Sequence, residues 1–247
     1  MIFKPKVSVI TVVLNNVNNI KKTIESVLHQ KYPNIEYIII DGGSTDGTLD
    51  VINKYKGKIN YLISEKDEGI FSAMNKGINV STGEYICFLN SGDHYSENFL
   101  EDYLIKNYSS DIDIYHSNLI LLKDNRVIGK QKPLIEFKKM LNHMGNPLLH
   151  PTVLSKKYIF LEIGKFNLKY TLAADHDWCF NAIIGGYKLF YLDKYNLFFD
   201  IDGVSNSNRA LKESQLILES NGLQLIYSRL IYVKLVIKKF VIRCFKK

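Results

Sequence analysis

Three carboxylates stand just beyond points where apolar stretches of the sequence end. Asp41, Asp67 and Asp93 each come directly or within a few residues after a run of bulky apolar residues, and each has glycine nearby. A carboxylate at a strand end can accept hydrogen bonds from a base or ribose, and one can hold a divalent cation against a diphosphate. Asn, Ser, Gly and Asp are also turn formers, so an ordinary strand end is the alternative. Taken together, the three repeats of this pattern favour a nucleotide site.

The elements that would position these residues alternate between strand and helix over the first ninety residues. The β-branched and apolar runs predict strands at 7–13, 35–40, 59–63 and 84–89, and the 3.6-residue apolar spacing predicts helices at 20–28, 48–55 and 70–80. This alternation predicts right-handed βαβ units and a parallel sheet, whose carboxyl edge is the usual place for ligands. Beyond residue 110 the pattern is weaker, with short strands at 112–115 and 119–122, an irregular stretch at 130–160 and a helix at 175–184.

Other nucleotide-binding motifs are missing from the sequence. There is no GxxxxGK[ST] phosphate-binding loop, and the turn after the first strand, residues 14–17, reads LNNV and not GxGxxG. The same turn lacks the basic, glycine-rich loop expected of a nucleotidyltransferase. The sequence therefore argues against a P-loop enzyme, a dinucleotide-dependent enzyme and a nucleotidyltransferase.

The composition describes a globular chain. Its 247 residues are 46% hydrophobic and 23% charged, which suits one substantial core. The three cysteines form no CxxC pair, so they indicate neither a zinc site nor a disulfide framework, and a reducing, cytoplasmic location is expected. The first apolar run is too short for a secretion signal, and no stretch is long and uncharged enough for a membrane span.

The positive charge is concentrated at the end of the chain. The formal net charge is +7, and after Glu219 there is no acid but there are seven bases: Arg229, Lys234, Lys238, Lys239, Arg243, Lys246 and Lys247. The formal charges of residues 1–220 therefore sum to about zero, so the net positive charge does not indicate a general nucleic-acid-binding surface. As a helix, residues 223–245 would carry an apolar stripe beside these bases, which predicts a peripheral contact with an anionic membrane. Packing of this helix on the domain or on a partner chain is the alternative.

We divide the chain into a domain at 1–220, with halves at 1–95 and 96–220, and a basic tail at 221–247.

Four motifs, in this order, resemble the nucleotide-sugar-binding half of family 2 glycosyltransferases. They are VSVITVVLN at 7–15, IIIDGGSTDGT at 38–48, SEKDEGIFSAMNKGI at 64–78 and GEYICFLNSGD at 83–93. The likeness continues more loosely to residue 206 and is greatest to the bacterial branch that builds capsules, O-antigens and exopolysaccharides. It implies the Rossmann-like GT-A fold with a mostly parallel sheet, a nucleoside-diphosphate sugar as donor, a divalent metal (Mg or Mn) and inversion at the anomeric carbon.

The resemblance also implies roles for individual residues. The positions that match donor-binding residues of the family are Thr11, Asn15, Asp41, Asp67 and Asn75. The family usually has a second acid after the first base-facing one, and here that position is Gly42, so recognition of the base is expected to be weaker or shifted. A UDP-sugar is the expected donor.

The metal-binding motif also has fewer acidic residues here than is usual in the family. Asp93 matches its last carboxylate, and the usual acidic companions are replaced by Asn90 and Gly92. Magnesium often binds one or two carboxylates together with substrate phosphates, so a single protein carboxylate remains workable.

One further acid, Asp175, is the candidate catalytic base. At the start of a predicted helix it is equally explained by the favourable interaction of an acid with the helix dipole, and its match to the family's catalytic aspartate favours the base. His176 is interpreted as an exposed neighbour. His150 is either a structural loop residue or a group near the diphosphate, and Trp178 is either a core residue or a stacking surface for an acceptor sugar.

These observations predict an inverting glycosyltransferase that moves a sugar from a nucleoside diphosphate to a hydroxyl of a lipid-linked or saccharide acceptor in bacterial surface polysaccharide synthesis. Its expected location is the cytoplasmic face of the plasma membrane. Gly42, Asn90 and Ala174 replace acids that the family usually has, the last a glutamate directly before the catalytic aspartate. These replacements leave an alternative, a non-catalytic nucleotide-sugar-binding partner of an assembly complex.

Overall fold

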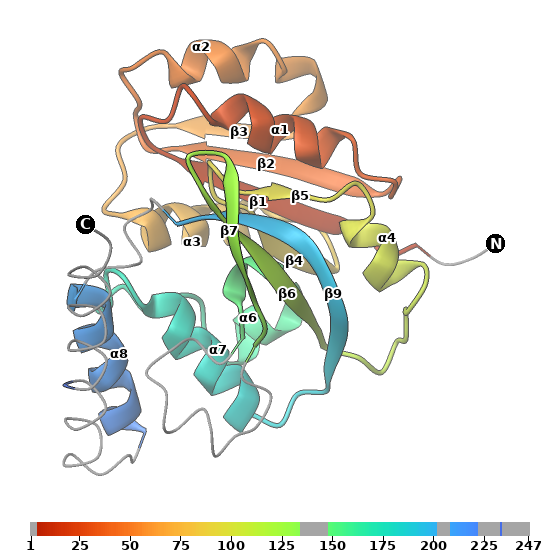
Figure 1. Cartoon of the computed structure of the whole chain (residues 1–247), viewed down its shortest axis with the longest axis vertical. Coiled ribbons are helices and arrows are strands. Elements are labelled where there is room, and N and C mark those ends of the chain that lie inside the picture. The colour runs from red at the N-terminus through yellow and green to blue at the C-terminus, as the bar shows by residue number, and fades with distance from the viewer. Residues whose placement is uncertain (1–3, 134–147, 202–207, 222–232, 234–247) are drawn as a thin grey trace.

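The computed structural model describes residues 4–133, 148–201, 208–221 and 233. A single curled sheet runs through it, with helices on both faces (Figure 1). The strands are β1 Val7–Val13, β2 Ile35–Asp41, β3 Tyr61–Ser64, β4 Tyr85–Phe88, β5 His94–Tyr95, β6 Ile114–Lys123, β7 Arg126–Gln131, β8 Leu154–Lys156 and β9 Leu189–Asp200. The helices are α1 Ile20–Leu28, α2 Thr48–Asn53, α3 Ile70–Val80, α4 Phe99–Leu104, α6 Tyr158–Glu162, α7 Ala174–Ile184 and α8 Asn208–Ser220, with short 3-10 turns η1 Lys56–Lys58 and η2 His150–Thr152.

The strand order is β3-β2-β1-β4-β8-β6-β9-β5, and β7 pairs with β6. The pairs β2/β3, β1/β2 and β1/β4 are parallel, as the alternation of strands and helices predicts. In the second half only β6/β9 is parallel, whereas β8, β7 and β5 pair antiparallel with their neighbours. The α/β fold is confirmed, but the sheet as a whole is mixed and the prediction of a mostly parallel sheet holds only for its first half.

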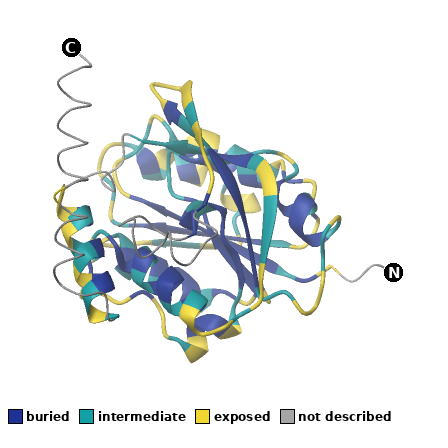
Figure 2. Cartoon of the chain, turned by 60° about the horizontal axis from the view of Figure 1, so that its bottom comes forward, coloured by how far each residue is buried: buried dark blue, intermediate teal, exposed yellow. Residues whose placement is uncertain are grey.

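Strand β1 shows why the first half folds as it does. Every residue of Val7–Val13 is buried, and successive side chains enter the two cores on opposite faces of the sheet. Helices α1, α2 and α4 contribute to the first core, and α3, α6 and α7 to the second. The buried residues gather along the sheet in the middle of the molecule (Figure 2). A run of β-branched residues covered on both sides is the pattern of a central parallel strand.

The second half departs from the sequence-based expectations. The two short strands expected at 112–115 and 119–122 are one ten-residue strand, β6, because its pairing with β9 continues through an irregularity at Ser117–Leu119. Strands β5, β7 and β9 and helices α4 and α8 were not predicted. The irregular stretch at 130–160 contains β8 and α6 among its described residues.

Apart from Val233, the predicted amphipathic helix of the basic tail lies outside the described residues. Among the residues that the structure describes, no helix is long and apolar enough to cross a membrane.

The register of the parallel strands sets the position of the predicted acids. Val13 pairs with Asp41, and Asp41 pairs with Ser64, so β1, β2 and β3 end at the same edge of the sheet. The amide of Ser91 bonds to the carbonyl of Val12, which brings the loop after β4 to this edge as well.

Candidate active site

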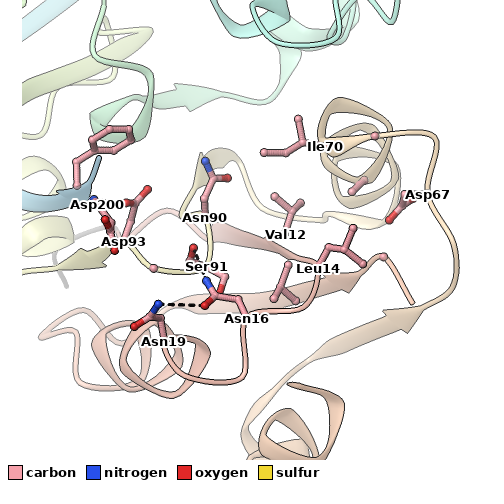
Figure 3. A pocket seen from close by; sticks show the side chains of 16 residues that line it. Val12, Leu14, Asn16, Asn19, Asp67, Ile70, Asn90, Ser91, Asp93 and Asp200 are labelled. Atoms are coloured by element: carbon pink, nitrogen blue, oxygen red, sulfur yellow. Dashed lines mark hydrogen bonds between the residues drawn. The ribbon is translucent and has the colours of Figure 1, made fainter. Parts of the chain in front are cut away.

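A cavity of about 510 Å³ opens at this edge of the sheet (Figure 3). Its floor is the end of β1, represented by Val12 and Leu14, and the start of α3 closes one side with Ile70. Asp67 lies at one end, and Asp93 lies at the other. Of the three acids that the sequence singles out, the structure brings two into one cavity.

At the second end of the cavity, Asp93 is joined by Asp200, the last residue of β9 (Figure 3). The amide nitrogen of Asp200 donates a 2.9 Å hydrogen bond to Oδ1 of Asp93, and both residues line the cavity. Asp93 is only 3% exposed. Burial raises the pKa of Asp93 to about 8, and the carboxylate of Asp200 adds to the rise while the hydrogen bond opposes it.

The loop between β4 and β5 is held in place from α1. Thr23 Oγ1 donates to the carbonyl of Asp93 at 2.8 Å and accepts from the amide of Gly92 at 3.0 Å. Gly92 has φ 109°, a left-handed conformation that side chains rarely adopt. Asn90 Oδ1 and Ser91 Oγ line the cavity as buried atoms without a hydrogen-bond partner among the described residues. Buried polar atoms normally have a hydrogen-bond partner, so a ligand or water is expected beside these two.

This end of the cavity fits a divalent cation. Carboxylate and amide oxygens, as supplied by Asp93, Asp200 and Asn90, are the hard donors that magnesium and manganese prefer. A cation would also relieve the repulsion between the two carboxylates. Among the described residues, no three or more His, Cys, Asp or Glu side chains form a group that could hold a metal ion alone. The remaining ligands would therefore come from a bound diphosphate.

At the other end of the cavity, Asp67 is paired with a lysine of α3. Oδ1 of Asp67 lies 2.7 Å from Nζ of Lys76, which also contacts Glu65 at 2.6 Å. Hydrogen bonds to the two carboxylates raise the pKa of Lys76. A Cβ on Gly42 would lie 3.5 Å from Oδ2 of Asp67. At that distance a Cβ would be in ordinary van der Waals contact with the Asp67 carboxylate, both of whose oxygens are buried.

Asp41 and Asn15 organise the neighbouring loops and do not line the cavity. The buried carboxylate of Asp41 accepts from Ser44 Oγ at 2.5 Å and from Ser64 Oγ at 2.6 Å. Asn15 has φ 49°, and its Oδ1 accepts from the amide of Thr45 at 2.8 Å. These contacts tie the loop after β1 to the loop after β2. Contact of Asp41 or Asn15 with a nucleoside stays a prediction.

Thr11 and Asn75 are also outside the cavity lining. Thr11 is fully buried within β1, and its hydroxyl lies 3.2 Å from that of Tyr37. The amide group of Asn75 forms two hydrogen bonds with the backbone of Phe166, at 2.9 and 3.0 Å. Both side chains therefore already have internal partners, and a direct role in donor binding stays a prediction for them.

Asp175 occupies the first turn of α7 and is not among the residues that line the cavity. Burial lowers the pKa of both His150 and His176, and the carboxylate of Asp175 opposes this shift at each. His150 stacks against Phe88 with ring centroids 5.4 Å apart, inside an aromatic cluster. The catalytic role of Asp175 stays a prediction.

Two interpretations of α7 have clear outcomes. His176 is 3% exposed, so the interpretation as an exposed neighbour is wrong: α7 is buried around most of its circumference. Trp178 is 2% exposed and stacks on Phe160 at 4.4 Å, which confirms it as a core residue.

Sequence reasoning missed Asp200. The sequence contains a signal for it, because the apolar run Leu197, Phe198 and Phe199 is followed directly by an acid, as are the earlier strands. The preceding segment, YLDKYN at 191–196, contains polar residues that interrupt the apolar pattern from which a strand is predicted.

The sheet and the cavity at its carboxyl edge are those of the GT-A fold. Staphylococcus aureus TarS has this fold with a TM-score of 0.67, at 19% identity over 92% of this chain and 69% of that structure. The mannosyltransferase PcManGT from Pyrobaculum calidifontis, in complex with GDP-Man and Mn2+, has a TM-score of 0.68, at 16% identity over 93% of this chain and 68% of that structure.

Residues 8–153 match the model of glycosyl transferase family 2, and the chain belongs to this family. An uncharacterized glycosyltransferase of Rickettsia prowazekii is 34% identical over 181 residues, which are 69% of this chain and 57% of the relative. A PGL/p-HBAD biosynthesis glycosyltransferase of Mycobacterium bovis is 28% identical over 82% of this chain and 80% of its own. Putative teichuronic acid biosynthesis glycosyltransferase TuaG of Bacillus subtilis is 39% identical over 41% of this chain and 42% of its own. The chain thus spans little more than half the length of the Rickettsia relative.

Proposed function

We propose that this protein is an inverting glycosyltransferase of bacterial surface polysaccharide synthesis. It moves a sugar from a nucleoside diphosphate, with UDP as the first choice, to a hydroxyl of a lipid-linked or saccharide acceptor. The observation that carries the proposal is the cavity with Asp67 at one end and the Asp93–Asp200 pair at the other, in a chain of glycosyl transferase family 2. The relative TuaG, named for teichuronic acid biosynthesis, supports the pathway.

Asp93 and Asp200, with the amide oxygen of Asn90, would hold the divalent cation. When bound, the cation neutralises the charge that develops on the departing diphosphate. The complexes of TarS with UDP-GlcNAc and of PcManGT with GDP-Man and Mn2+ support a nucleotide sugar as donor, and the second supports a divalent metal. The nucleoside would lie toward Asp67, where Lys76 fixes the carboxylate.

Transfer requires a base for the acceptor hydroxyl, and we assign this role to Asp175. Its carboxylate takes the hydroxyl proton while the acceptor oxygen forms a bond to C1 of the donor sugar. The bond from C1 to the diphosphate oxygen breaks on the opposite face, so the configuration at C1 is inverted. The chemistry requires no covalent intermediate with the protein.

The setting of this reaction is the cytoplasmic face of the plasma membrane. We infer that the basic tail, residues 223–247, contacts anionic lipid, because as a helix its sequence would place a stripe of apolar residues beside seven bases. This brings a cytoplasmic donor and a lipid-linked acceptor to the same protein.

A panel of nucleotide sugars with manganese or magnesium, scored by released nucleoside diphosphate, tests the proposal. We expect one donor to be turned over slowly by water in the absence of acceptor, and Asp93→Asn to reduce this turnover by about two orders of magnitude or more. The matched control is Asp46→Asn, in the loop after β2 and outside the cavity lining. Binding of a nucleotide sugar without turnover under any condition would instead identify a non-catalytic binder.

A further inference from the structure

Strands β6 and β7 form a hairpin that lies in front of the sheet in Figure 1, and its turn projects beyond the body of the protein in Figure 2. Its two turn residues, Asp124 and Asn125, have φ of 49° and 59°. Two left-handed residues in succession are typical of the tight type I′ turn, which favours Asn and Asp. The side chain of Asn125 accepts a hydrogen bond from Nζ of Lys22 on α1 at 3.3 Å, so the tip is tethered to the nucleotide-binding half of the molecule.

The outer strand of this hairpin exposes two consecutive aliphatic side chains. Val127 is 62% exposed and Ile128 is 49% exposed. In a regular strand, consecutive side chains point to opposite faces. Here Leu122 pairs with Val127 and Leu121 pairs with Gly129, so Ile128 is an extra residue that the partner strand does not match. This bulge disturbs the alternation and leaves both aliphatic residues in contact with solvent.

Bases predominate among the charged residues on and beside the hairpin. The exposed positions on and beside the hairpin include four cations, Lys22, Lys123, Arg126 and Lys130, against one acid, Asp124. Lys132, further along, is neutralised by an ion pair with Asp193 at 2.7 Å and is not counted. Exposed aliphatic side chains on a hairpin that also carries exposed lysine and arginine complement a surface with negative headgroups above an apolar interior.

The turn end of the hairpin adjoins the cavity. Leu122 pairs with Asp200, and the amide of Ile201 donates to the carbonyl of Leu122 at 3.0 Å. A surface that holds the hairpin would therefore lie beside the end of the cavity that contains Asp93 and Asp200.

We propose that the β6–β7 hairpin docks the protein on an anionic phospholipid bilayer. Val127 and Ile128 enter the interfacial layer, and the four bases contact lipid phosphates. Lysines on an edge strand also discourage pairing with other strands, but that protection does not require two exposed aliphatic residues between them. The proposal concerns residues other than the basic tail, and it does not depend on which sugar the enzyme transfers.

Sedimentation of the full chain with vesicles of phosphatidylcholine, with and without phosphatidylglycerol, tests the docking surface. We expect binding to the anionic vesicles that weakens as salt is added. The double substitution Val127→Ser with Ile128→Ser should weaken it about tenfold. Arg126→Gln should weaken it about fivefold, the effect of roughly 1 kcal/mol per base near a membrane.

The matched control is Leu161→Ser with Leu168→Ser, which removes two comparably exposed aliphatic side chains (70% and 51%) from positions outside the hairpin. The control should bind vesicles as the unaltered protein does, and all variants should keep their thermal midpoint and their donor turnover in solution. If the hairpin variants bind the vesicles as tightly as the unaltered protein does, the hairpin takes no part in membrane binding and the proposal is wrong. The basic tail alone would then bind the protein to the vesicles. If they instead abolish a self-association seen without vesicles, the hairpin is a contact between copies, and the proposal is equally wrong.

Discussion

The amide nitrogen of Asp200 lies 2.9 Å from Oδ1 of Asp93, although 107 positions of sequence separate the two residues. This hydrogen bond joins the end of β9 to the loop after β4. Antiparallel pairing of β5 with β9 brings the two segments together, because His94 lies opposite Phe198. As a result, both halves of the chain contribute a carboxylate to the same end of the cavity.

We expect Asp200→Asn to weaken manganese binding by about tenfold or more and to slow donor turnover in parallel. The substitution removes one of two carboxylates at the proposed cation site. It leaves the backbone amide that bonds to Asp93, so the loop should keep its position. Titration of the protein with manganese, in the presence of the nucleoside diphosphate, measures the change.

The control for this prediction is Asp193→Asn on the same strand. Asp193 is paired with Lys132 at the surface, and its side chain is 60% exposed. Its substitution should leave manganese affinity unchanged. Equal affinities of the Asp200→Asn variant and the unaltered protein would show that Asp200 takes no part in the cation site.

The nucleotide-binding half could be predicted because its signals are local. Strand β1 is a continuous run of β-branched residues buried on both faces, and α3 begins and ends at the predicted residues 70 and 80. Burial of such runs needs only a sheet with helices on each side, which the alternation of elements already implies.

The acceptor-side half and the full set of site residues could not be predicted in the same way. Strand β9 carries charged residues in its middle and breaks register twice against β6, so no period-2 pattern marks it. The partnership of Asp200 with Asp93 arises from strand pairing across the chain. The same limit applies to Asp41, whose place at a strand end was predictable, whereas its hydrogen bonds with Ser44 and Ser64 depend on the folded loops.

The buried Glu36 provides a prediction of pH-dependent stability. Burial alone would raise the pKa of this carboxyl group, but hydrogen bonds from Lys6, Ser8 and Thr82 outweigh burial and bring the pKa from 4.5 to about 2. A folded-state pKa below the unfolded one stabilises the fold above the unfolded value, and this contribution is lost as pH falls through the folded value. The contribution should therefore be complete at neutral pH and should decrease between pH 4.5 and about 2.

We expect Glu36→Gln to lower the free energy of unfolding by about 2 to 3 kcal/mol at neutral pH and by less near about pH 3. Urea unfolding at the two pH values measures this. Glu97→Gln, which alters an exposed pair with Lys31, should change little at either pH. An equal loss at both pH values for Glu36→Gln would assign the effect to packing and not to the charge.

Gly77 provides a prediction of packing between α3 and β1. A Cβ at this position would lie 2.5 Å from Cγ2 of the fully buried Ile10. We expect Gly77→Ala to destabilise the fold by about 1 to 3 kcal/mol in urea unfolding, since overpacking exceeds the gain of at most about 1 kcal/mol in helix propensity. Gly57→Ala is the control, because no atom lies within 4 Å of a Cβ there. A Gly77→Ala variant as stable as the control would show that α3 can shift away from the sheet without loss.

The assignment of Asp175 as the base predicts that the Asp175→Asn variant still binds the donor but transfers the sugar slowly. Because Asp175 does not line the cavity, the affinity for the nucleoside diphosphate should stay within about twofold of the unaltered protein. Transfer to an acceptor should slow by about two to four orders of magnitude, the usual effect of losing a general base. Asp177→Asn, on the same helix turn, is the control and should retain transfer. Full activity of the Asp175→Asn variant would assign the acid at the start of α7 to the favourable interaction with the helix dipole, and the base would then have to come from another group.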